Sequence, residues 1–148
     1  MNENEISEMI ELAMQARTKA YEPYSNFQVG ACVKMENGSY YTGCNIENAS
    51  YGATNCAERT AVFKAVSEGV LEFDAICVVG GMNKVLKEYA APCGVCRQVM
   101  MEFCDPDTLQ TGHCRICRTR LRDRCSKEQT GISDVFGRRA ASGDISFE

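Results

Sequence analysis

Apolar residues near the start of the chain recur at the three- and four-residue spacing of an amphipathic helix. They are Ile6, Met9, Ile10, Ala13, Ala16 and Ala20. Acidic residues at the beginning of this stretch favour the positive end of a helix dipole. The pattern therefore predicts an amphipathic helix with Glu3, Glu5 and Glu8 near its start and Ala20 as its last apolar residue, followed by a turn-rich loop over residues 21–26.

A period of two takes over in the next segment and predicts a β-hairpin. Apolar residues alternate with small or polar ones over residues 29–35, and residues 39–43 return as a second strand. Between them, Asn37-Gly38 is a strong hairpin turn. The polar residues 45–55 are then expected to form a loop.

Three further elements complete the predicted pattern. A helix is expected over residues 56–68, closed by Gly69, and a buried strand over residues 73–80. Another helix begins after Pro92 and runs to about Phe103. The order helix, strand, strand, helix, strand, helix predicts a sheet covered by helices, an α/β layered domain.

The length and composition suit one compact domain. The 148 residues are 45% hydrophobic and 24% charged, which is ordinary for a soluble globular protein. The apolar runs are too short to cross a bilayer, and the acidic N-terminus is unlike a signal or transit peptide. We therefore expect a cytoplasmic protein with reduced thiols. The net charge of −4 predicts no general attraction to nucleic acid or to an anionic membrane.

Ten cysteines are many for such a chain and suggest a metal site. Cys93 and Cys96 lie one turn apart at the start of a predicted helix, and Cys56 begins another. The two helix N-termini favour thiolates over thiols. Three thiolates bind Zn²⁺ tetrahedrally and leave the fourth position open, which is typical of a catalytic zinc site.

Two charged residues beside Cys56 strengthen this hypothesis. Glu58 lies about 200° around the helix from Cys56, so it is badly placed to bind the metal but well placed to flank the open position as a proton shuttle. Arg59 would offset part of the negative charge of three thiolates. The alternatives are metal-free buried cysteines and a closed structural knuckle, which needs a fourth ligand. The single histidine, His113, lies in a different part of the chain, so a catalytic zinc is favoured.

Four segments carry a more specific pattern. They are Tyr24-Ser-Asn-Phe-Gln-Val-Gly-Ala, Thr42-Gly-Cys-Asn-Ile-Glu-Asn-Ala-Ser-Tyr-Gly, Cys56-Ala-Glu-Arg-Thr-Ala and Pro92-Cys-Gly-Val-Cys-Arg-Gln. In this order and spacing, over residues 5–110, the chain resembles the cytidine deaminase family of small zinc-dependent nucleoside deaminases. A cysteine as the first ligand is similar to the free-nucleoside branch of the wider deaminase class.

The resemblance implies a three-layer α/β fold in which helices cover a mixed sheet. It also implies one Zn²⁺ per subunit, held by Cys56, Cys93 and Cys96. Glu58 would take a proton from the attacking water and protonate the ring nitrogen of cytosine. The implied reaction is hydrolytic deamination of cytidine or deoxycytidine to uridine or deoxyuridine plus ammonia, in pyrimidine salvage.

The resemblance further implies which residues bind the nucleoside. Asn45 and Glu47 match the family's ribose-binding pair, and Phe27 matches the aromatic residue that packs near the pyrimidine. Ala57 matches a position whose backbone reads the cytosine edge. Taken alone, Asn45 and Glu47 have an ordinary polar loop as their alternative interpretation. The alternative for Phe27 is a core residue.

A homotetramer is implied by the same resemblance. Tyr51 matches a residue that reaches the site of a neighbouring subunit. The segment Asp134-Val-Phe-Gly is similar to the family's terminal aromatic segment, so Phe136 is expected to help close a neighbour's pocket. The expected partners are therefore a small-molecule nucleoside and further copies of this chain, with no nucleic acid and no membrane.

The chain departs from the family pattern after about residue 110. A strand is expected after the Asp105-Pro-Asp turn, yet residues 111–125 lack apolar alternation. Residues 1–110 hold 8 Lys and Arg against 15 Asp and Glu, whereas residues 111–148 hold 8 against 5. We therefore divide the chain into a catalytic domain, residues 1–110, and a divergent C-terminal segment of the same domain, residues 111–148.

Several hypotheses compete for the C-terminal segment. Five arginines could form a nucleic-acid-binding strip, but aromatic residues that would stack on bases are not interleaved with them. Ordinary divergence is another explanation. A reading-frame change near codon 110 is favoured, because the composition changes abruptly and a core strand's pattern is lost. A second, structural zinc would use His113, Cys114, Cys117 and Cys125.

Two alternative functions follow from the same residues. The first is deamination of another cytosine nucleoside analogue, such as an antibiotic. The second is a zinc-stabilised binding module without catalysis, for which Glu58 would be dispensable. Cytidine turnover by the purified protein separates the leading hypothesis from the second alternative.

Overall fold

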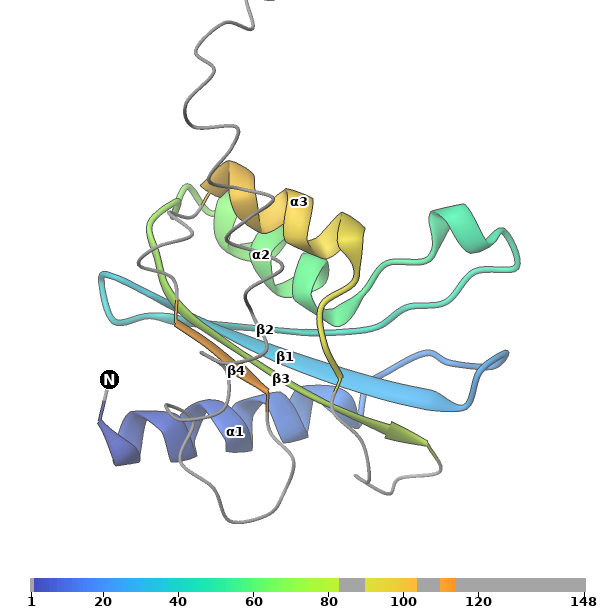
Figure 1. The fold of residues 1–148 in the computed structure, drawn as a ribbon, viewed down its shortest axis with the longest axis horizontal. Helices are drawn as coiled ribbons and strands as arrows, with labels where there is room; N and C mark the ends of the chain where they lie inside the picture. Colours follow the sequence, from blue (N-terminus) through green and yellow to red (C-terminus); the bar gives the residue numbers. More distant parts are fainter. Residues whose placement is uncertain (1, 83–89, 104–109, 114–148) are drawn as a thin grey trace, which may run out of the picture. The chain divides into compact units, whose positions relative to one another are not determined.

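The computed structural model describes residues 2–82, 90–103 and 110–113 (Figure 1). All of them belong to the unit Met1–Cys117, and a second unit, Arg118–Glu148, lies wholly outside the described residues. The elements are α1 (Glu3–Arg17), β1 (Phe27–Met35), β2 (Tyr40–Cys44), the 3₁₀ turn η1 (Tyr51–Ala53), α2 (Ala57–Ser67), β3 (Phe73–Met82), α3 (Gly94–Phe103) and β4 (Gln110–His113).

Four strands form one mixed sheet in the order β2-β1-β3-β4. β1 runs antiparallel to β2 and to β3, so Phe27 at the start of β1 lies opposite Met82 at the end of β3. β3 and β4 run parallel. Helix α1 covers one face of the sheet, and α2 and α3 lie on the other (Figure 1). This arrangement confirms the expected three-layer α/β fold with a mixed sheet.

Helix α1 begins at Glu3, among the acidic residues expected near its start, and ends a few residues earlier than the apolar pattern predicts. It begins after a capping box, in which the Asn2 side chain accepts from the Glu5 N–H at 2.9 Å and Glu5 accepts from the Asn2 N–H at 2.7 Å. At the other end, the N–H groups of residues 18–20 bond to carbonyls three residues back. These bonds tighten the last turn, and Tyr21 then leaves the helix to pair with Ile46.

The strands bury alternate residues on opposite faces of the sheet. Ala31 and Val33 of β1 belong to the apolar cluster beneath α2 and α3, whereas Cys32 belongs to the cluster beneath α1. The thiols of Cys32 and Cys77 are both buried in the cluster beneath α1, where Met9 and Ala13 of that helix pack against them. These two cysteines therefore lie on the opposite face of the sheet from α2 and α3.

Two glycines set the position and length of α2. A Cβ on Gly43 would lie 2.4 Å from both the Ala57 carbonyl oxygen and the Ala61 nitrogen, so only glycine lets the first turn of α2 lie this close to β2. Gly69, with φ of +82°, ends the helix as predicted, and the Val70 N–H bonds to the Ala65 carbonyl at 3.0 Å.

The strand expected after residues 105–107 is β4, but it includes residues for which the sequence pattern indicated no strand. β4 pairs with Ala75–Val78 of β3 through its backbone. A ladder of backbone hydrogen bonds forms without apolar alternation, which is why the pattern over residues 111–113 was a poor guide. Cys114, Cys117, Cys125 and Phe136 lie outside the described residues.

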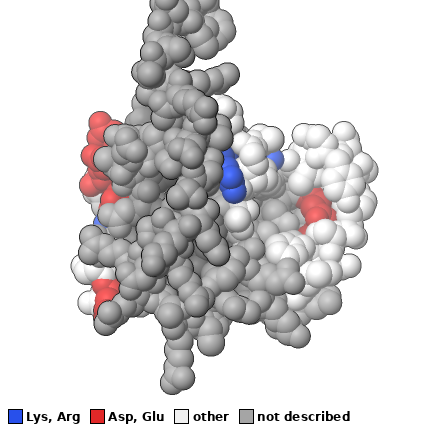
Figure 2. All heavy atoms as spheres, viewed as in Figure 1, with Lys and Arg blue, Asp and Glu red and all other residues white. Residues whose placement is uncertain are grey.

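The described helices are all too short or too polar to cross a membrane. Figure 2 shows one face of the molecule with its charged side chains coloured. The acidic and basic groups of described residues that are visible there are scattered and do not form one continuous patch.

Candidate metal centre

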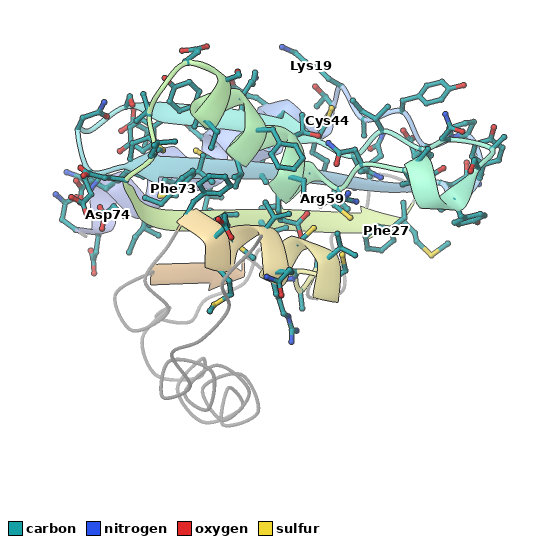
Figure 3. All side chains as sticks on the ribbon, turned by 90° about the horizontal axis from the view of Figure 1, so that it is seen from above. Lys19, Phe27, Cys44, Arg59, Phe73 and Asp74 are labelled. Atoms are coloured by element: carbon teal, nitrogen blue, oxygen red, sulfur yellow. The ribbon has the colours of Figure 1, made fainter. Side chains whose placement is uncertain are left out.

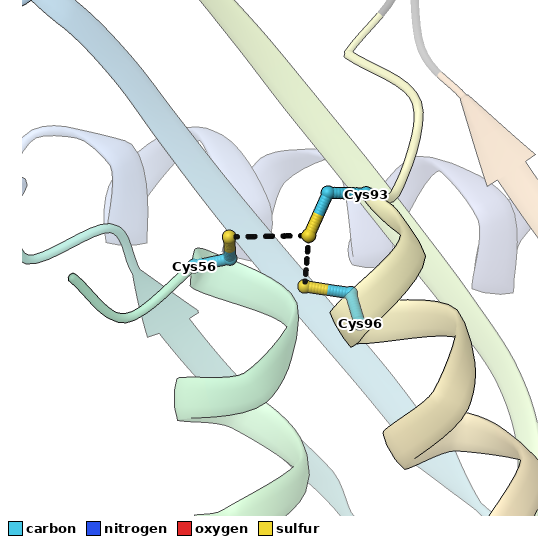
Figure 4. Close-up of side chains that lie close together, drawn as sticks. All are labelled: Cys56, Cys93 and Cys96. Atoms are coloured by element: carbon cyan, nitrogen blue, oxygen red, sulfur yellow. Dashed lines mark hydrogen bonds between the residues drawn. The ribbon is translucent and has the colours of Figure 1, made fainter. Parts of the chain in front are cut away.

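The sulfur atoms of Cys56, Cys93 and Cys96 meet at one point (Figure 4). The Cys56 and Cys93 Sγ atoms are 3.7 Å apart, the Cys93 and Cys96 Sγ atoms are 3.5 Å apart, and all three lie within 4.8 Å of one another. Tetrahedral Zn–S bonds of about 2.3 Å place neighbouring sulfurs roughly 3.8 Å apart. The spacing therefore suits Zn²⁺.

The starts of two helices bring these cysteines together. Cys56 is the N-cap residue of α2, Cys93 directly precedes α3, and Cys96 lies in the first turn of α3. The first turns of α2 and α3 lie side by side at this point (Figure 4). Both positive helix ends therefore face the sulfurs and favour thiolates.

Hydrogen bonding within the cluster makes the cysteines unequal. The hydrogen bond from Cys96, together with the Arg59 guanidinium, lowers the pKa of Cys56 to about 5. The same bond, together with complete burial, raises the pKa of Cys96. Cys56 thus carries a thiolate at neutral pH, and metal binding would release the remaining protons.

Glu58 lies in the first turn of α2 and is only 4% exposed. Burial raises its pKa to about 7, and the negative charge of Cys56 adds to this effect. A hydrogen bond with Cys96 acts in the opposite direction and places the carboxyl beside the cluster. A carboxyl with such a pKa can hold or release a proton near neutral pH.

Arg59 supplies the positive charge that faces the sulfurs. Its Nη2 donates to the Thr54 carbonyl oxygen at 2.9 Å and to the Cys56 Sγ at 3.6 Å. Its Nε is buried and has no hydrogen-bond partner within the described part of the chain. A cation held at this distance offsets part of the charge of three thiolates.

The donor set fits a zinc ion with one open position. Among residues 2–82 and 90–103, no histidine, carboxylate or further cysteine completes the group of three. A closed structural knuckle therefore has no fourth ligand in this part of the chain. Three cysteines beside a buried carboxyl and an arginine are the chemistry of a catalytic rather than a structural zinc site.

Phe27 lies at the end of the sheet nearest the metal centre. A Cβ on Gly80 would lie 3.1 Å from the Phe27 ring and 2.7 Å from the Cβ of Ala90, in the segment that leads into Cys93. The Phe27 ring and the ligand-bearing segment therefore flank the same point of β3. In Figure 3, Phe27 and Arg59 lie towards one end of the sheet and Phe73 and Asp74 towards the other.

Asn45 and Glu47 lie on the loop before η1, and both are tied to the segment around Phe27. The Asn45 side chain accepts from the Val29 N–H at 2.8 Å and donates to the Phe27 carbonyl at 2.8 Å, so it is bonded to the start of β1. Glu47 accepts from the Tyr24 N–H at 2.9 Å. Both side chains therefore have structural partners in addition to any ligand.

The remaining predicted residues have different surroundings. Ala57 is fully buried as the first residue of α2, next to Cys56. Tyr51, on η1, is 79% exposed. Phe136 lies outside the described residues.

Ser25 was not singled out by the sequence analysis, although it lies inside one of the family-like segments. Its hydroxyl donates to Glu47 Oε1 and accepts from the Phe27 N–H at 3.0 Å. A serine in a polar turn carries no pattern of its own, and its partner is distant in sequence. Only its contacts with Glu47 and Phe27, two candidate substrate-binding residues, identify it.

Residues 3–111 match the family model for the cytidine and deoxycytidylate deaminase zinc-binding region, so the match ends where the composition changes. A cytidine deaminase from Halalkalibacterium halodurans is 58% identical over 100 residues, or 68% of this chain and 73% of that protein. One from Sporosarcina psychrophila is 50% identical over 101 residues, or 68% and 71%. The crystal structure of cytidine deaminase from Burkholderia pseudomallei has a TM-score of 0.60 and 51% identity, over 70% of this chain and 77% of that one. From its sequence match and its fold, this chain belongs to the cytidine and deoxycytidylate deaminase family.

Proposed function

We propose that this chain is a zinc-dependent deaminase that hydrolyses cytidine and deoxycytidine to uridine and deoxyuridine and releases ammonia. The observation that supports this most strongly is the buried carboxyl of Glu58 beside three converging cysteine sulfurs. A structural zinc site has four protein ligands and no open position, so it needs no buried carboxyl group beside the metal.

The residues divide the work as follows. Cys56, Cys93 and Cys96 hold the metal, and bound Zn²⁺ supplies the Lewis acidity that activates the attacking water. Glu58 takes a proton from that water and passes it to the ring nitrogen of cytosine. Its burial and raised pKa suit both halves of the transfer. Arg59 balances the charge of the three thiolates.

The nucleoside would lie between the metal centre and the start of β1. The Phe27 ring packs near the pyrimidine, and the backbone at Ala57 faces the edge of the cytosine. Asn45 and Glu47 bind the sugar hydroxyls. The closeness of the Phe27 ring to the segment that carries Cys93 supports this arrangement.

The proposal includes a homotetramer that acts in the cytoplasm in pyrimidine salvage. Tyr51 would reach a neighbouring subunit's site, and its 79% exposure leaves it accessible to another chain. Phe136 would help close such a site. Sedimentation analysis of the purified protein tests the assembly, and a monomer that deaminates cytidine at a normal rate would contradict it.

For residues 111–148 we propose a reading-frame change near codon 110 within a domain that otherwise extends over residues 1–110. The sequence of the encoding DNA tests this idea. An alternative frame that continues an apolar strand after Leu109 is expected, and its absence would refute the frame change. The same proposal predicts a low melting temperature or incomplete tetramers.

The activity is tested with purified wild-type protein and Glu58→Gln. Wild-type protein should deaminate cytidine, as seen in the fall of cytidine absorbance and the release of ammonia. Glu58→Gln should lose about 10²- to 10⁴-fold in kcat while keeping about one zinc per chain. A protein that binds zinc but leaves cytidine unchanged would be a binding module. Faster turnover of a cytosine nucleoside analogue in competition with cytidine would reveal a different substrate.

A further inference from the structure

The carboxylate of Glu47 already has three donors in the described structure. Oε2 accepts from the Tyr24 N–H at 2.9 Å and from the Ser25 N–H at 3.2 Å, and Oε1 accepts from the Ser25 hydroxyl. Burial alone would raise the pKa of Glu47, but these hydrogen bonds hold the pKa below its ordinary value. Glu47 is therefore an ionised acceptor whose orientation is set by the turn at residues 24–25.

Ser25 connects this carboxylate to Phe27. Its single hydroxyl proton goes to Glu47, and its oxygen accepts from the Phe27 N–H at 3.0 Å. Between Ser25 and Phe27, Asn26 has a φ of 55°, a left-handed conformation that asparagine adopts more readily than most residues other than glycine. The two hydrogen bonds of the Ser25 hydroxyl join this turn to Glu47 on one side and to the start of β1 on the other.

The Glu47 segment is also joined to the start of α2. Ile46 pairs on one side with Tyr21 and on the other with Asn55, the residue before Cys56. The Glu47 N–H donates to the Tyr21 carbonyl at 2.8 Å, and the Asn55 N–H donates to the Ile46 carbonyl at 2.9 Å. Glu47 is thus held by backbone pairing relative to the metal centre, and its side chain by Ser25.

We propose that Ser25 is a positioning residue that orients Glu47 for one sugar hydroxyl and holds Phe27 at the same time. This inference rests on the proposed function, in which Glu47 binds the sugar. A carboxylate offers about four lone-pair directions, and three donors leave about one for a ligand. The Ser25 contact to Oε1 therefore decides which direction stays open.

A positioning role makes a specific statement about substrates. Without the Ser25 hydroxyl, Oε1 loses its donor, and the carboxylate can turn away from the sugar. The Phe27 N–H also loses its acceptor. Substrates that carry the hydroxyl bound by Glu47 should therefore bind more weakly. A substrate that lacks this hydroxyl should be affected less.

The test compares Ser25→Ala, Glu47→Gln and the double variant in the full-length protein. Ser39→Ala is the matched control, because Ser39 also donates to a side-chain oxygen, that of Asn37 at 2.6 Å, but lies in the β1–β2 turn. KM and kcat are measured for cytidine and for its 2′-, 3′- and 5′-deoxy analogues. Zinc content, melting temperature and the dissociation constant of uridine are measured alongside.

We expect Ser25→Ala to raise the KM for cytidine about tenfold, the size of one lost hydrogen bond to a charged group, with a smaller change in kcat. The analogue least affected by Glu47→Gln should also be least affected by Ser25→Ala. Ser25→Ala should add little in the Glu47→Gln background, because residues that act through one another are not additive. Ser25→Thr, which keeps the hydroxyl, should restore KM, and Ser39→Ala should leave it unchanged.

Equal increases of KM for all four substrates, or a normal KM for cytidine in Ser25→Ala, would overturn the inference. If Ser25→Ala does not fold, Ser25→Cys replaces the hydroxyl with a weak donor of similar shape and gives the same comparison. Failure of the wild-type protein to deaminate any of the four substrates would instead refute the proposed function. Even then, an unchanged dissociation constant for uridine in Ser25→Ala would overturn the positioning role.

Discussion

The Nη2 of Arg59 donates a hydrogen bond to the Sγ of Cys56 over 3.6 Å, and the same nitrogen is held by the Thr54 carbonyl at 2.9 Å. These two hydrogen bonds therefore hold the guanidinium beside the Cys56 sulfur. Its Nε is buried and has no partner in the described part of the chain, which costs free energy. We propose that Arg59 is retained for the positive charge that it places beside the thiolates.

Replacing Arg59 tests that role. Arg59→Gln removes the positive charge, so more thiolate charge reaches the metal and the attacking water becomes harder to ionise. We expect kcat for cytidine to fall about 10- to 100-fold while the zinc content changes little. Arg59→Lys should recover part of the loss, because lysine restores the charge but not the planar geometry. A wild-type kcat in Arg59→Gln would show that the charge is not used.

The metal ligands are tested by zinc stoichiometry. Cys93→Ser and Cys96→Ser should each lower the zinc content from about one per chain to a small fraction, because a neutral hydroxyl is a poor ligand compared with a thiolate. Cys44→Ser is the matched control, since the Cys44 Sγ only donates to the Lys19 carbonyl at 3.3 Å and a hydroxyl can do the same. Metal analysis of dialysed protein gives the answer. Full zinc retention in Cys96→Ser would rule out the proposed ligand set.

The packing of α2 on β2 is tested at Gly43. Gly43→Ala places a methyl group 2.4 Å from the Ala57 carbonyl oxygen and so must displace the turn that carries the metal ligand at its start. We expect the free energy of unfolding to fall by about 2 kcal/mol, the usual cost of overpacking, together with weaker zinc binding. Gly52→Ala should leave the melting temperature close to that of wild type, because a Cβ there meets nothing within 4 Å. Similar melting temperatures for both variants would contradict this account.

Lys34 joins α1 to β3 and makes stability depend on pH. Its Nζ lies 2.8 Å from Glu5 Oε1 and 2.9 Å from Asp74 Oδ2. The hydrogen bond from Lys34 is the main reason that the pKa of Glu5 lies below its ordinary value, and the two carboxylates raise the pKa of Lys34.

The sign of this effect follows from linkage. Because the pKa of Glu5 is lower in the folded than in the unfolded state, its ionised carboxylate stabilises the fold at pH values above the unfolded-state pKa. This contribution is lost as the pH falls through the folded-state pKa. Lys34→Met should therefore lower the melting temperature by about 3 °C at pH 7, and the difference from wild type should shrink as the pH falls below the ordinary range of a glutamate. Melting curves between pH 7 and about 3 measure it. A difference that stays constant over this range would exclude an ionic contribution from Glu5.

Local signals in the sequence predicted most element boundaries. Asn37-Gly38 and Gly69 mark a turn and a helix end because their backbone conformations depend mainly on neighbouring residues. The start of β1 was placed too late, since Phe27 and Gln28 pair with Met82 and Gly81 of β3, a strand that is distant in sequence. Ser25 was missed for the same reason, because its partner Glu47 is not a sequence neighbour.

The sequence by itself determined the chemistry of this protein: three thiols, an acid two residues from the first of them, and spacing that places Cys93 and Cys96 one helical turn apart. Those features depend on residue type and on the fixed geometry of a helix. Only the tertiary structure decided that Cys56 comes within 3.7 Å of Cys93, that Glu58 is buried enough to have a pKa of about 7, and that Ser25 holds Glu47. Distances and solvent exclusion between segments far apart in the chain arise from the packing of whole helices on a sheet, and no local pattern records them.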